Sequence, residues 1–520
     1  MRFTSSPSGD NRHNVRSIYP FVLIPLLTLL LTVGAMNFYL KSHAAAPTNT
    51  HVHFNAKNTV VNTPSSTTWY IDGGSVGGGF QEFLTIQNPN TTTATVTITY
   101  LLQANPPVNP IHTRSVNHTI AASTRQTIDV DQDLHTSQTG AHITAAAIVH
   151  VTNNVPIVVE RPWYFTNLGV ATGTDAFGVT IPQKNYYFAE AASLKANKVG
   201  QPAYNTYVSV LNPSTTVTAH ATITYFNGSC GGNGQPACQV QQATLIPLQR
   251  QVLIPANGQN LYAKYSIAVT ADVPVVAERL TYIKDNIVNA GGFTTGAIMN
   301  VGATAPGTDW LFAEGFTGSG FQEYFELANF GTTAANAQVK LEYTNGATQT
   351  VAVSVPALGI TQFDVNAHPG PTTAASAEIT SNNPIVAERL MYFHFGSNKI
   401  SGTTDVVGIP AAHQTYAFAE GFTSSNFTEF LTLQNPNAVA ETATVTYYLT
   451  TTSFQLQYNL AAHSRTTINV NGAIASRGGG AVSMLVSATG SIVAERPMYF
   501  IYGSGTTTEQ GGTDVIGFTG

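Results

Sequence analysis

Four sequence motifs recur in the same order along the chain, and this repeat constrains the fold more than any other feature. One motif contains an adjacent Glu-Arg pair, and its copies read PIVVERPWY from Pro156, PVVAERLTY from Pro274, PIVAERLMY from Pro384 and SIVAERPMY from Ser491. The glutamates of these copies are 118, 110 and 107 residues apart. A solenoid coil or propeller blade has a shorter period of roughly 20–50 residues. Each repeat is therefore long enough to bury a core of its own.

The other three motifs set the repeat boundaries. An opening motif reads WYIDGG, YYFAEA, WLFAEG and YAFAEG, and a second motif reads FQEFLTIQNPN, NTYVSVLNPS, FQEYFELANFG and FTEFLTLQNPN. A closing motif, TDAFG, TDVVG or TDVIG, ends three of the repeats. We place the repeats at residues 67–182, 183–307, 308–412 and 413–520. The second repeat is divergent, because it has Ala191 for the opening glycine, Thr206 at the position of Glu82 and no Thr-Asp close.

The repeats have the hydrophobic pattern of β-strands. In Thr93–Tyr100, apolar residues alternate with threonines, and the same alternation recurs at Ala221–Tyr225 and Thr442–Tyr447. This period of two is typical of half-buried strands, and Asn-Pro pairs at 88, 212 and 435 indicate turns. We therefore expect an all-β chain: four tandem Ig-like antiparallel β-sandwich repeats after an N-terminal hydrophobic helix. We expect four separate sandwiches rather than one closed ring.

Residues 1–41 have the pattern of an export signal or a membrane anchor. A polar stretch with Arg2, Arg12 and Arg16 precedes an apolar run at 18–40, which Lys41 closes. Such a run spans a bilayer core of about 30 Å. Two alternatives remain open: a signal peptide cleaved near Ala44–Ala46, or an uncleaved plasma-membrane anchor. In both, residues 42–66 are a linker and the repeats are extracytoplasmic, at the cell surface or secreted.

Two cysteines suit this location. Cys230 and Cys238 flank a glycine-rich stretch, and their short separation favours one local disulfide over two free thiols. No second Cys or His pair has zinc-ligand spacing, so we expect no metal and no cofactor.

Charge is scarce and is concentrated at repeated positions. Charged residues make up 9% of the chain, against about 25% in an ordinary soluble domain. With 21 basic and 27 acidic residues, the chain has no basic stripe for nucleic acid. Fourteen acids occupy four recurrent positions: Asp72/Glu190/Glu314/Glu420, Glu82/Glu323/Glu429, Glu160/Glu278/Glu388/Glu495 and Asp175/Asp405/Asp514.

These acids and four recurrent arginines form our candidate site. In Ile385–Phe393 the alternation places Arg389 on one strand face and Glu388 on the other. A charge on an apolar face must be paired. We therefore predict a structural ion-pair network that ties the sheets together within each repeat and involves Glu82, Glu160, Arg161, Glu278, Arg279, Glu314, Glu323, Glu388, Arg389, Glu420, Glu429, Glu495 and Arg496.

The order AEG, FQEYL-LQNP, VPA with a following arginine or threonine, PIVAER-MYF and TDVIG resembles a repeat module of exported bacterial cell-surface proteins. The pattern covers nearly all of residues 67–520, and Glu314, Glu323, Asn329, Glu388, Arg389 and Asp405 of the third repeat match it. A more distant likeness is to the β-sandwich family of sensory-rhodopsin transducers, which implies a sandwich with a sugar- or small-ligand-binding role.

We predict a non-enzymatic, exported or membrane-anchored scaffold or adhesion protein. A plain spacer and a binder of neutral glycans or surface proteins both remain open, with Gly73–Phe80, Gly315–Phe321 and Gly421–Phe427 as candidate contact loops. The alternative is a secreted carbohydrate-active enzyme that uses two of the repeated carboxylates. GGSVG at Gly73–Gly77 matches a hydrolase pattern, and Asp129, Asp131 and Asp133 match the start of a calcium loop. Neither has the remaining residues of its motif, so we expect no catalytic residue.

Overall fold

The computed structural model describes residues 63–103, 111–136, 142–195, 201–228, 230, 238–255, 264–397, 400–504 and 507–520. Strands make up 66% and helices 4%, so the prediction of an all-β fold with antiparallel sheets is confirmed. Residues 1–41 and most of the linker at 42–66, including the apolar run at 18–40, lie outside these residues. Within the described part, no helix has the length and apolar character needed to cross a bilayer.

Each sequence repeat supplies its own group of strands. The first contains β1 (Thr68–Ile71), β2 (Ser75–Val76), β3 (Phe80–Asn88), β4 (Ala94–Leu102), β5 (His112–Ile120), β6 (Thr124–Asp129), α2 (Val130–Leu134), β7 (Ile143–Val151), β8 (Val158–Glu160), β9 (Trp163–Asn167) and β10 (Val170–Thr174). The second contains β11 (Gln183–Phe188), β12 (Ala203–Leu211), β13 (Ala219–Phe226), β14 (Gln239–Leu245), β15 (Arg250–Leu253), β16 (Ser266–Ile287) and β17 (Gly292–Val301).

The remaining two repeats follow the same order. The third contains β18 (Gly307–Phe312), β19 (Phe321–Asn329), β20 (Ala335–Tyr343), β21 (Thr348–Val355), β22 (Gly359–Asp364), η1 (Val365–Ala367), β23 (Ala375–Phe395) and β24 (Ile400–Val407). The fourth contains β25 (His413–Phe418), β26 (Phe422–Thr423), β27 (Phe427–Asn435), β28 (Glu441–Leu449), β29 (Ser453–Leu460), β30 (Ser464–Asn469), α4 (Val470–Ile474), η2 (Ala475–Arg477), β31 (Gly480–Glu495), β32 (Met498–Ser504) and β33 (Thr507–Thr513).

One long strand in the middle of each repeat belongs to two sheets. The first half of β23 pairs with β18 and β20, and its second half pairs with β19 and β24. β16 does the same in the second repeat. In the fourth repeat the corresponding strand is interrupted at Pro497, and in the first it is divided into β7, β8 and β9, with a break at residues 152–157 and another at Pro162; proline lacks the N–H that a central strand needs. Both faces of this strand are buried around its Glu-Arg pair.

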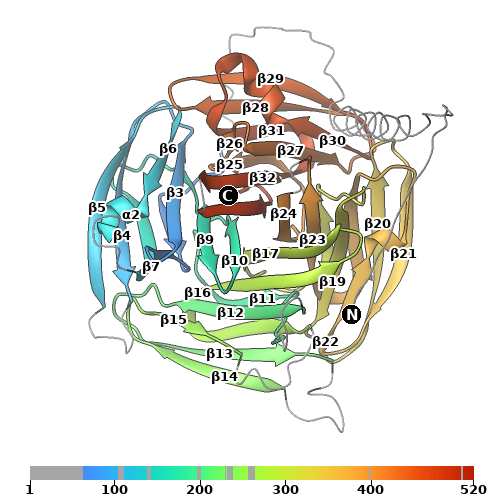
Figure 1. Cartoon of the computed structure of the whole chain (residues 1–520), viewed down its shortest axis with the longest axis horizontal. Helices are drawn as coiled ribbons and strands as arrows, with labels where there is room; N and C mark the ends of the chain where they lie inside the picture. The colour runs from blue at the N-terminus through green and yellow to red at the C-terminus, as the bar shows by residue number, and fades with distance from the viewer. Residues whose placement is uncertain are drawn as a thin grey trace, which may run out of the picture. The chain divides into compact units, whose positions relative to one another are not determined.

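Each repeat has an apolar core of its own, and the cores of the first and third repeats also include alanines from the opening motif of a neighbouring repeat: Ala417, Ala419 and Ala189. The repeats do not stand as separate sandwiches, since the described residues from 63 to 520 belong to one compact unit. In Figure 1 the four strand groups follow one another around a centre, and the fourth returns to the first. Arg496 of the fourth repeat binds Glu160 and Asp175 of the first. Our expectation that the chain does not close into a ring is therefore wrong.

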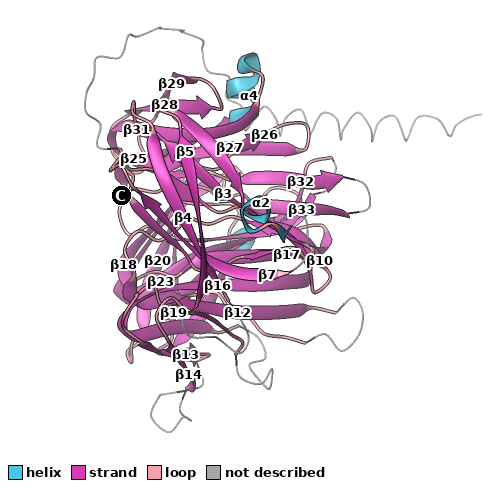
Figure 2. Ribbon diagram, turned by 90° about the vertical axis from the view of Figure 1, so that its left-hand side faces the viewer, coloured by secondary structure: helices cyan, strands magenta, loops and turns pink. Residues whose placement is uncertain are grey.

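Each repeat also sends one hairpin to the centre of the ring. These hairpins are β9–β10, β16–β17, β23–β24 and β32–β33 (Figure 1). In Figure 2, β32 and β33 lie on the side opposite the C-terminus. A Cβ on Gly402 would lie 3.0 Å from the Cα of Gly511, so glycine permits the backbones of neighbouring repeats to approach closely here.

The two ends of the described chain meet at the junction between the fourth and first repeats. A Cβ on Gly520 would lie 3.9 Å from the Cα of Pro64. A circular permutant that joins Gly520 to Ser65 and opens the chain between Ala305 and Pro306 should keep the thermal midpoint within a few degrees, as measured by calorimetry. A second permutant, opened inside β19, should fail to fold. Loss of the fold in the first permutant would contradict the ring closure.

Candidate functional site: ion-pair centres between the repeats

The Glu-Arg motif places its two charges on opposite faces of one strand, because successive side chains point to opposite sides. In the ring these two faces meet different neighbours. Arg279 of the second repeat binds Glu388 of the third with an Nη1–Oε2 distance of 2.7 Å. The adjacent Glu278 instead binds Arg161 of the first repeat at 2.7 Å. The predicted network therefore lies between repeats, and the expectation that it ties sheets together within each repeat is wrong.

The same centre occurs at all four junctions. Each arginine binds the motif glutamate of the next repeat: Arg161 with Glu278, Arg279 with Glu388, Arg389 with Glu495, and Arg496 with Glu160. At three junctions the closing-motif aspartate of the next repeat also binds the arginine: Asp405, Asp514 and Asp175. We call these four clusters the arginine centres. All of their side chains are buried.

Backbone groups complete each arginine centre. The amides of Ala189 and Glu190 donate to the two oxygens of Glu388 at 2.7 and 3.1 Å. The amide of Ala313 donates to Glu495, and that of Ala419 to Glu160, both at 2.6 Å. The carboxylate thus accepts from the opening motif of the preceding repeat as well as from its arginine. Such charge-assisted hydrogen bonds offset the cost of removing a carboxylate from water.

The divergent second repeat alters the centre that it shares with the first. Met299 occupies the position of the closing aspartate, three residues before Gly302 as Asp405 is before Gly408. Its sulfur lies 2.8 Å from Nη2 of Arg161. This arginine therefore has one carboxylate at its own centre where the other three have two.

The acids of the opening motif form a second set of centres at the same junctions. Glu420 binds Arg125 at 2.8 Å, and Glu314 binds Arg465 at 2.6 Å. In the first repeat the acid is Asp72, which lies one residue earlier in the motif, where the other repeats have alanine. Its carboxylate accepts from Ser209 at 2.9 Å and lies 3.5 Å from Arg250 of the second repeat. The basic partners Arg125, Arg250 and Arg465 were not predicted as members of the network, although AASTR before Gln126 and AAHSR before Thr466 show a common position for two of them.

The junction between the second and third repeats uses a different cation. In the third repeat Gly359 pairs with Asn329 and is followed by Ile360. In the fourth repeat Ser464 pairs with Asn435 and is followed by Arg465, so Ile360 occupies the position of Arg465. Lys264 replaces the missing arginine: its ammonium lies 3.7 Å from Glu190 and also binds Glu326. Glu326 itself stands where the fourth repeat has Thr432. The loss of an arginine and the gain of a glutamate are thus compensated by one lysine.

The glutamates of the second motif are buried without a hydrogen bond from an arginine. Glu82, Glu323 and Glu429 lie against Gly74, Gly315 and Gly421, where a side chain would collide; a Cβ on Gly421 would lie 2.6 Å from Glu429. Burial raises the pKa of each of these three carboxyls to about 8, although a nearby arginine lowers it in part. At neutral pH these glutamates are therefore largely protonated, unlike ordinary carboxyls.

The other sequence candidates have structural roles. Cys230 and Cys238 form a disulfide with a Cα–Cα distance of 4.7 Å. Asp129 caps α2, Asp131 accepts from Thr136, and Asp133 accepts from Tyr100 at 2.7 Å. Ser75 of the GGSVG stretch is buried in β2 rather than exposed at a strand-to-helix turn. Among the described residues, no three His, Cys, Asp or Glu side chains are grouped as a metal site.

Comparison with known proteins adds little to this picture. No protein-family model and no curated protein matches the chain. Among solved structures, the crystal structure of Thermotoga maritima 1070 matches with 18% identity and a TM-score of 0.18, over 24% of this chain and 94% of that one. A similarity of this size supports no inference about fold or function.

Replacing the arginine of a centre that contains two acids should strongly destabilise the ring. Arg389→Met leaves Glu495 and Asp514 buried without a counter-charge, and we expect a loss of about 3–5 kcal/mol of unfolding free energy. Arg161→Met leaves only Glu278 at its centre and should cost less. Chemical denaturation of both variants measures the difference, and adding Glu495→Gln and Asp514→Asn should restore most of the loss in the first. Equal losses at the two centres would contradict the assignment.

The three protonated glutamates should make the protein less stable in alkali. Because their folded-state pKa is about 8 and their unfolded value is near 4.5, their contribution to stability is full below about pH 4.5 and is lost as the pH rises through 8. The triple variant Glu82→Gln, Glu323→Gln and Glu429→Gln should show a smaller fall of thermal midpoint between pH 6 and 9. Asp309→Asn, at an exposed residue, is the control. An unchanged pH profile in the triple variant would refute the protonation assignment.

Proposed function

We propose that this chain is an exported, non-enzymatic surface protein whose four Ig-like β-sandwich repeats form a rigid display scaffold. The observation that carries the proposal is the burial of all fourteen recurrent acids and all four recurrent arginines. A carboxylate that is buried and paired with an arginine of a neighbouring repeat holds the ring together and has no access to a substrate. The repeated charges therefore serve cohesion.

The remaining parts of the proposal rest on the sequence and on the disulfide. Residues 18–40 would tether the scaffold to the plasma membrane or direct its secretion. A disulfide between Cys230 and Cys238 suits an oxidising compartment outside the cytoplasm. The partner that fits best is a neutral glycan, because the loop at Gly421–Phe427 exposes Phe422 with Ser424, Ser425 and Asn426, which can combine ring contact with hydrogen bonds.

The rival function, a carbohydrate-active enzyme, requires two carboxyls about 5–10 Å apart in an open cleft. Glu314 and Glu388 facing each other in an open groove would support this role. Glu314 binds Arg465 between the third and fourth repeats, and Glu388 binds Arg279 between the second and third. Since both are buried and face different junctions, the display scaffold is the better-supported function.

The location can be tested with a tag at the C-terminus of the full chain. In bacterial cells the tag should be accessible to antibody on intact cells, and deletion of residues 1–41 should retain the protein in the cytoplasm. The purified protein should release no reducing ends from neutral polysaccharides. An inaccessible tag in the full chain would contradict export, and polysaccharide cleavage that Glu388→Gln abolishes would favour the enzyme.

A further inference from the structure

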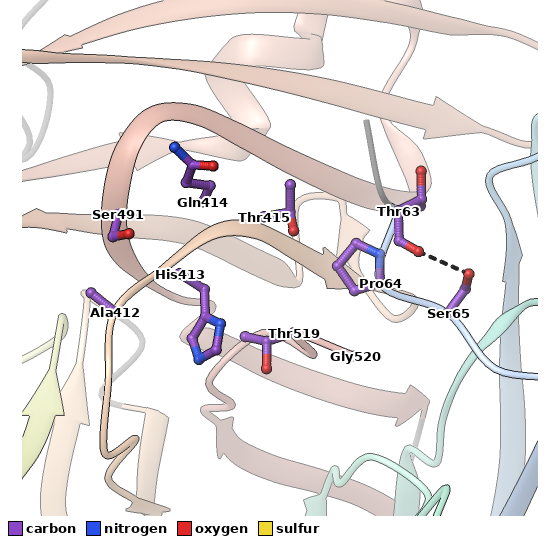
Figure 3. A pocket seen from close by; sticks show the side chains of 10 residues that line it. All are labelled: Thr63, Pro64, Ser65, Ala412, His413, Gln414, Thr415, Ser491, Thr519 and Gly520. Carbon is purple, nitrogen blue, oxygen red and sulfur yellow. Dashed lines mark hydrogen bonds between the residues drawn. The ribbon is translucent and has the colours of Figure 1, made fainter. Parts of the chain in front are cut away.

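A polar pocket of about 460 Å³ lies where the two ends of the described chain meet. Figure 3 shows its lining, which comes from four separate segments: 63–65, 412–415, 491 and 519–520. It lies apart from the ion-pair centres and shares no residue with them. Its volume falls in the range of roughly 300–1,000 Å³ that is usual for small-molecule sites.

Small residues of the fourth repeat open this pocket. Ala412 lies four residues before Tyr416, and the corresponding positions of the second and third repeats hold Pro182 and Pro306. Ser491 begins the fourth copy of the Glu-Arg motif, and the other three copies begin with proline. In the second and fourth repeats the backbone amide three residues before the tyrosine donates to the tyrosine hydroxyl: Gln183 to Tyr186 and His413 to Tyr416. Ala412 and Ser491 thus have smaller side chains than the prolines at the corresponding positions of the other repeats.

The lining side chains carry hydrogen-bonding groups but no carboxylate, ammonium or guanidinium. Thr415, Ser491 and Thr519 supply hydroxyls, and Gln414 supplies an amide oxygen, while its amide nitrogen donates to the carbonyl of Thr489. Burial lowers the pKa of His413, so its imidazole is neutral at neutral pH. An anionic ligand would lose its hydration here without gaining a counter-charge, because no lysine or arginine lines the pocket. A neutral ligand rich in hydroxyls can instead exchange its water hydrogen bonds for those of the pocket.

We propose that this pocket binds one neutral sugar residue, such as the terminal hexose of a glycan. The ring faces of His413 and Pro64 supply apolar surface for the C–H groups of the sugar, and the hydroxyl and amide groups bind its oxygens. This inference rests on the proposed function, of which it names the ligand class and the place of binding.

Saturation-transfer NMR on the full chain, kept in a sugar-free detergent, can test the pocket with glucose, galactose, mannose and N-acetylglucosamine. We expect a signal from at least one of these four and none from glucuronate, because the pocket offers no counter-charge. Ser491→Pro and Ala412→Pro introduce the residue that other repeats carry, so they should keep the thermal midpoint while weakening binding at least tenfold. Pro274→Ser, at the position in the second repeat that corresponds to Ser491, is the matched control and should leave binding unchanged.

Two results would overturn the inference. One is the absence of a signal from all four neutral sugars, and the other is equal sugar binding by the two proline variants and the parent protein. In the second case the neutral-glycan partner would stand and only this pocket would be excluded. Failure of the proposed function itself would be seen separately, as an inaccessible C-terminal tag or as cleavage of polysaccharide.

Discussion

The structure depends on one constraint: adjacent residues of a β-strand point to opposite sides. A Glu-Arg pair on a strand that is buried on both faces must find a partner on each side. Here the glutamate finds the arginine of the preceding repeat, and the arginine finds the glutamate of the following one. Each repeat therefore supplies an arginine to one neighbour and a glutamate to the other, and four such repeats pair every Glu-Arg motif by closing on themselves. In this ring the two-residue motif determines the order of the domains.

Buried ion pairs are a costly means of cohesion, since apolar residues of similar volume often stabilise as well. Their value here is discrimination between junctions. The first junction has Met299 in place of an aspartate, and the second has Lys264 and Glu326 in place of an arginine and a threonine. A junction assembled from the wrong repeats would leave a buried charge without its partner. The differences between repeats therefore favour one arrangement over shuffled ones.

The sequence was sufficient to predict the all-β fold, the repeat motifs and the recurrent acids and arginines of the arginine centres. The alternation around Arg389 also placed Glu388 and Arg389 on opposite faces. The alternation could not show that both faces of this strand are buried against other repeats. A strand with two buried faces and a strand with one face in solvent have the same local pattern. Ring closure and the partners Arg125 and Arg465 depend on contacts between residues about 150 to 300 positions apart, which no local pattern records.

The covalent continuity of the ring has a consequence for its behaviour on dilution. Four separate subunits joined by the same centres would dissociate as their concentration falls, because assembly would follow mass action. In this chain, three junctions are bridged by the backbone, so the fourth closes as an intramolecular event with an effective concentration set by the other three. Its stability is consequently independent of how much protein is present. The single chain therefore keeps its ring at dilutions that would disperse a tetramer.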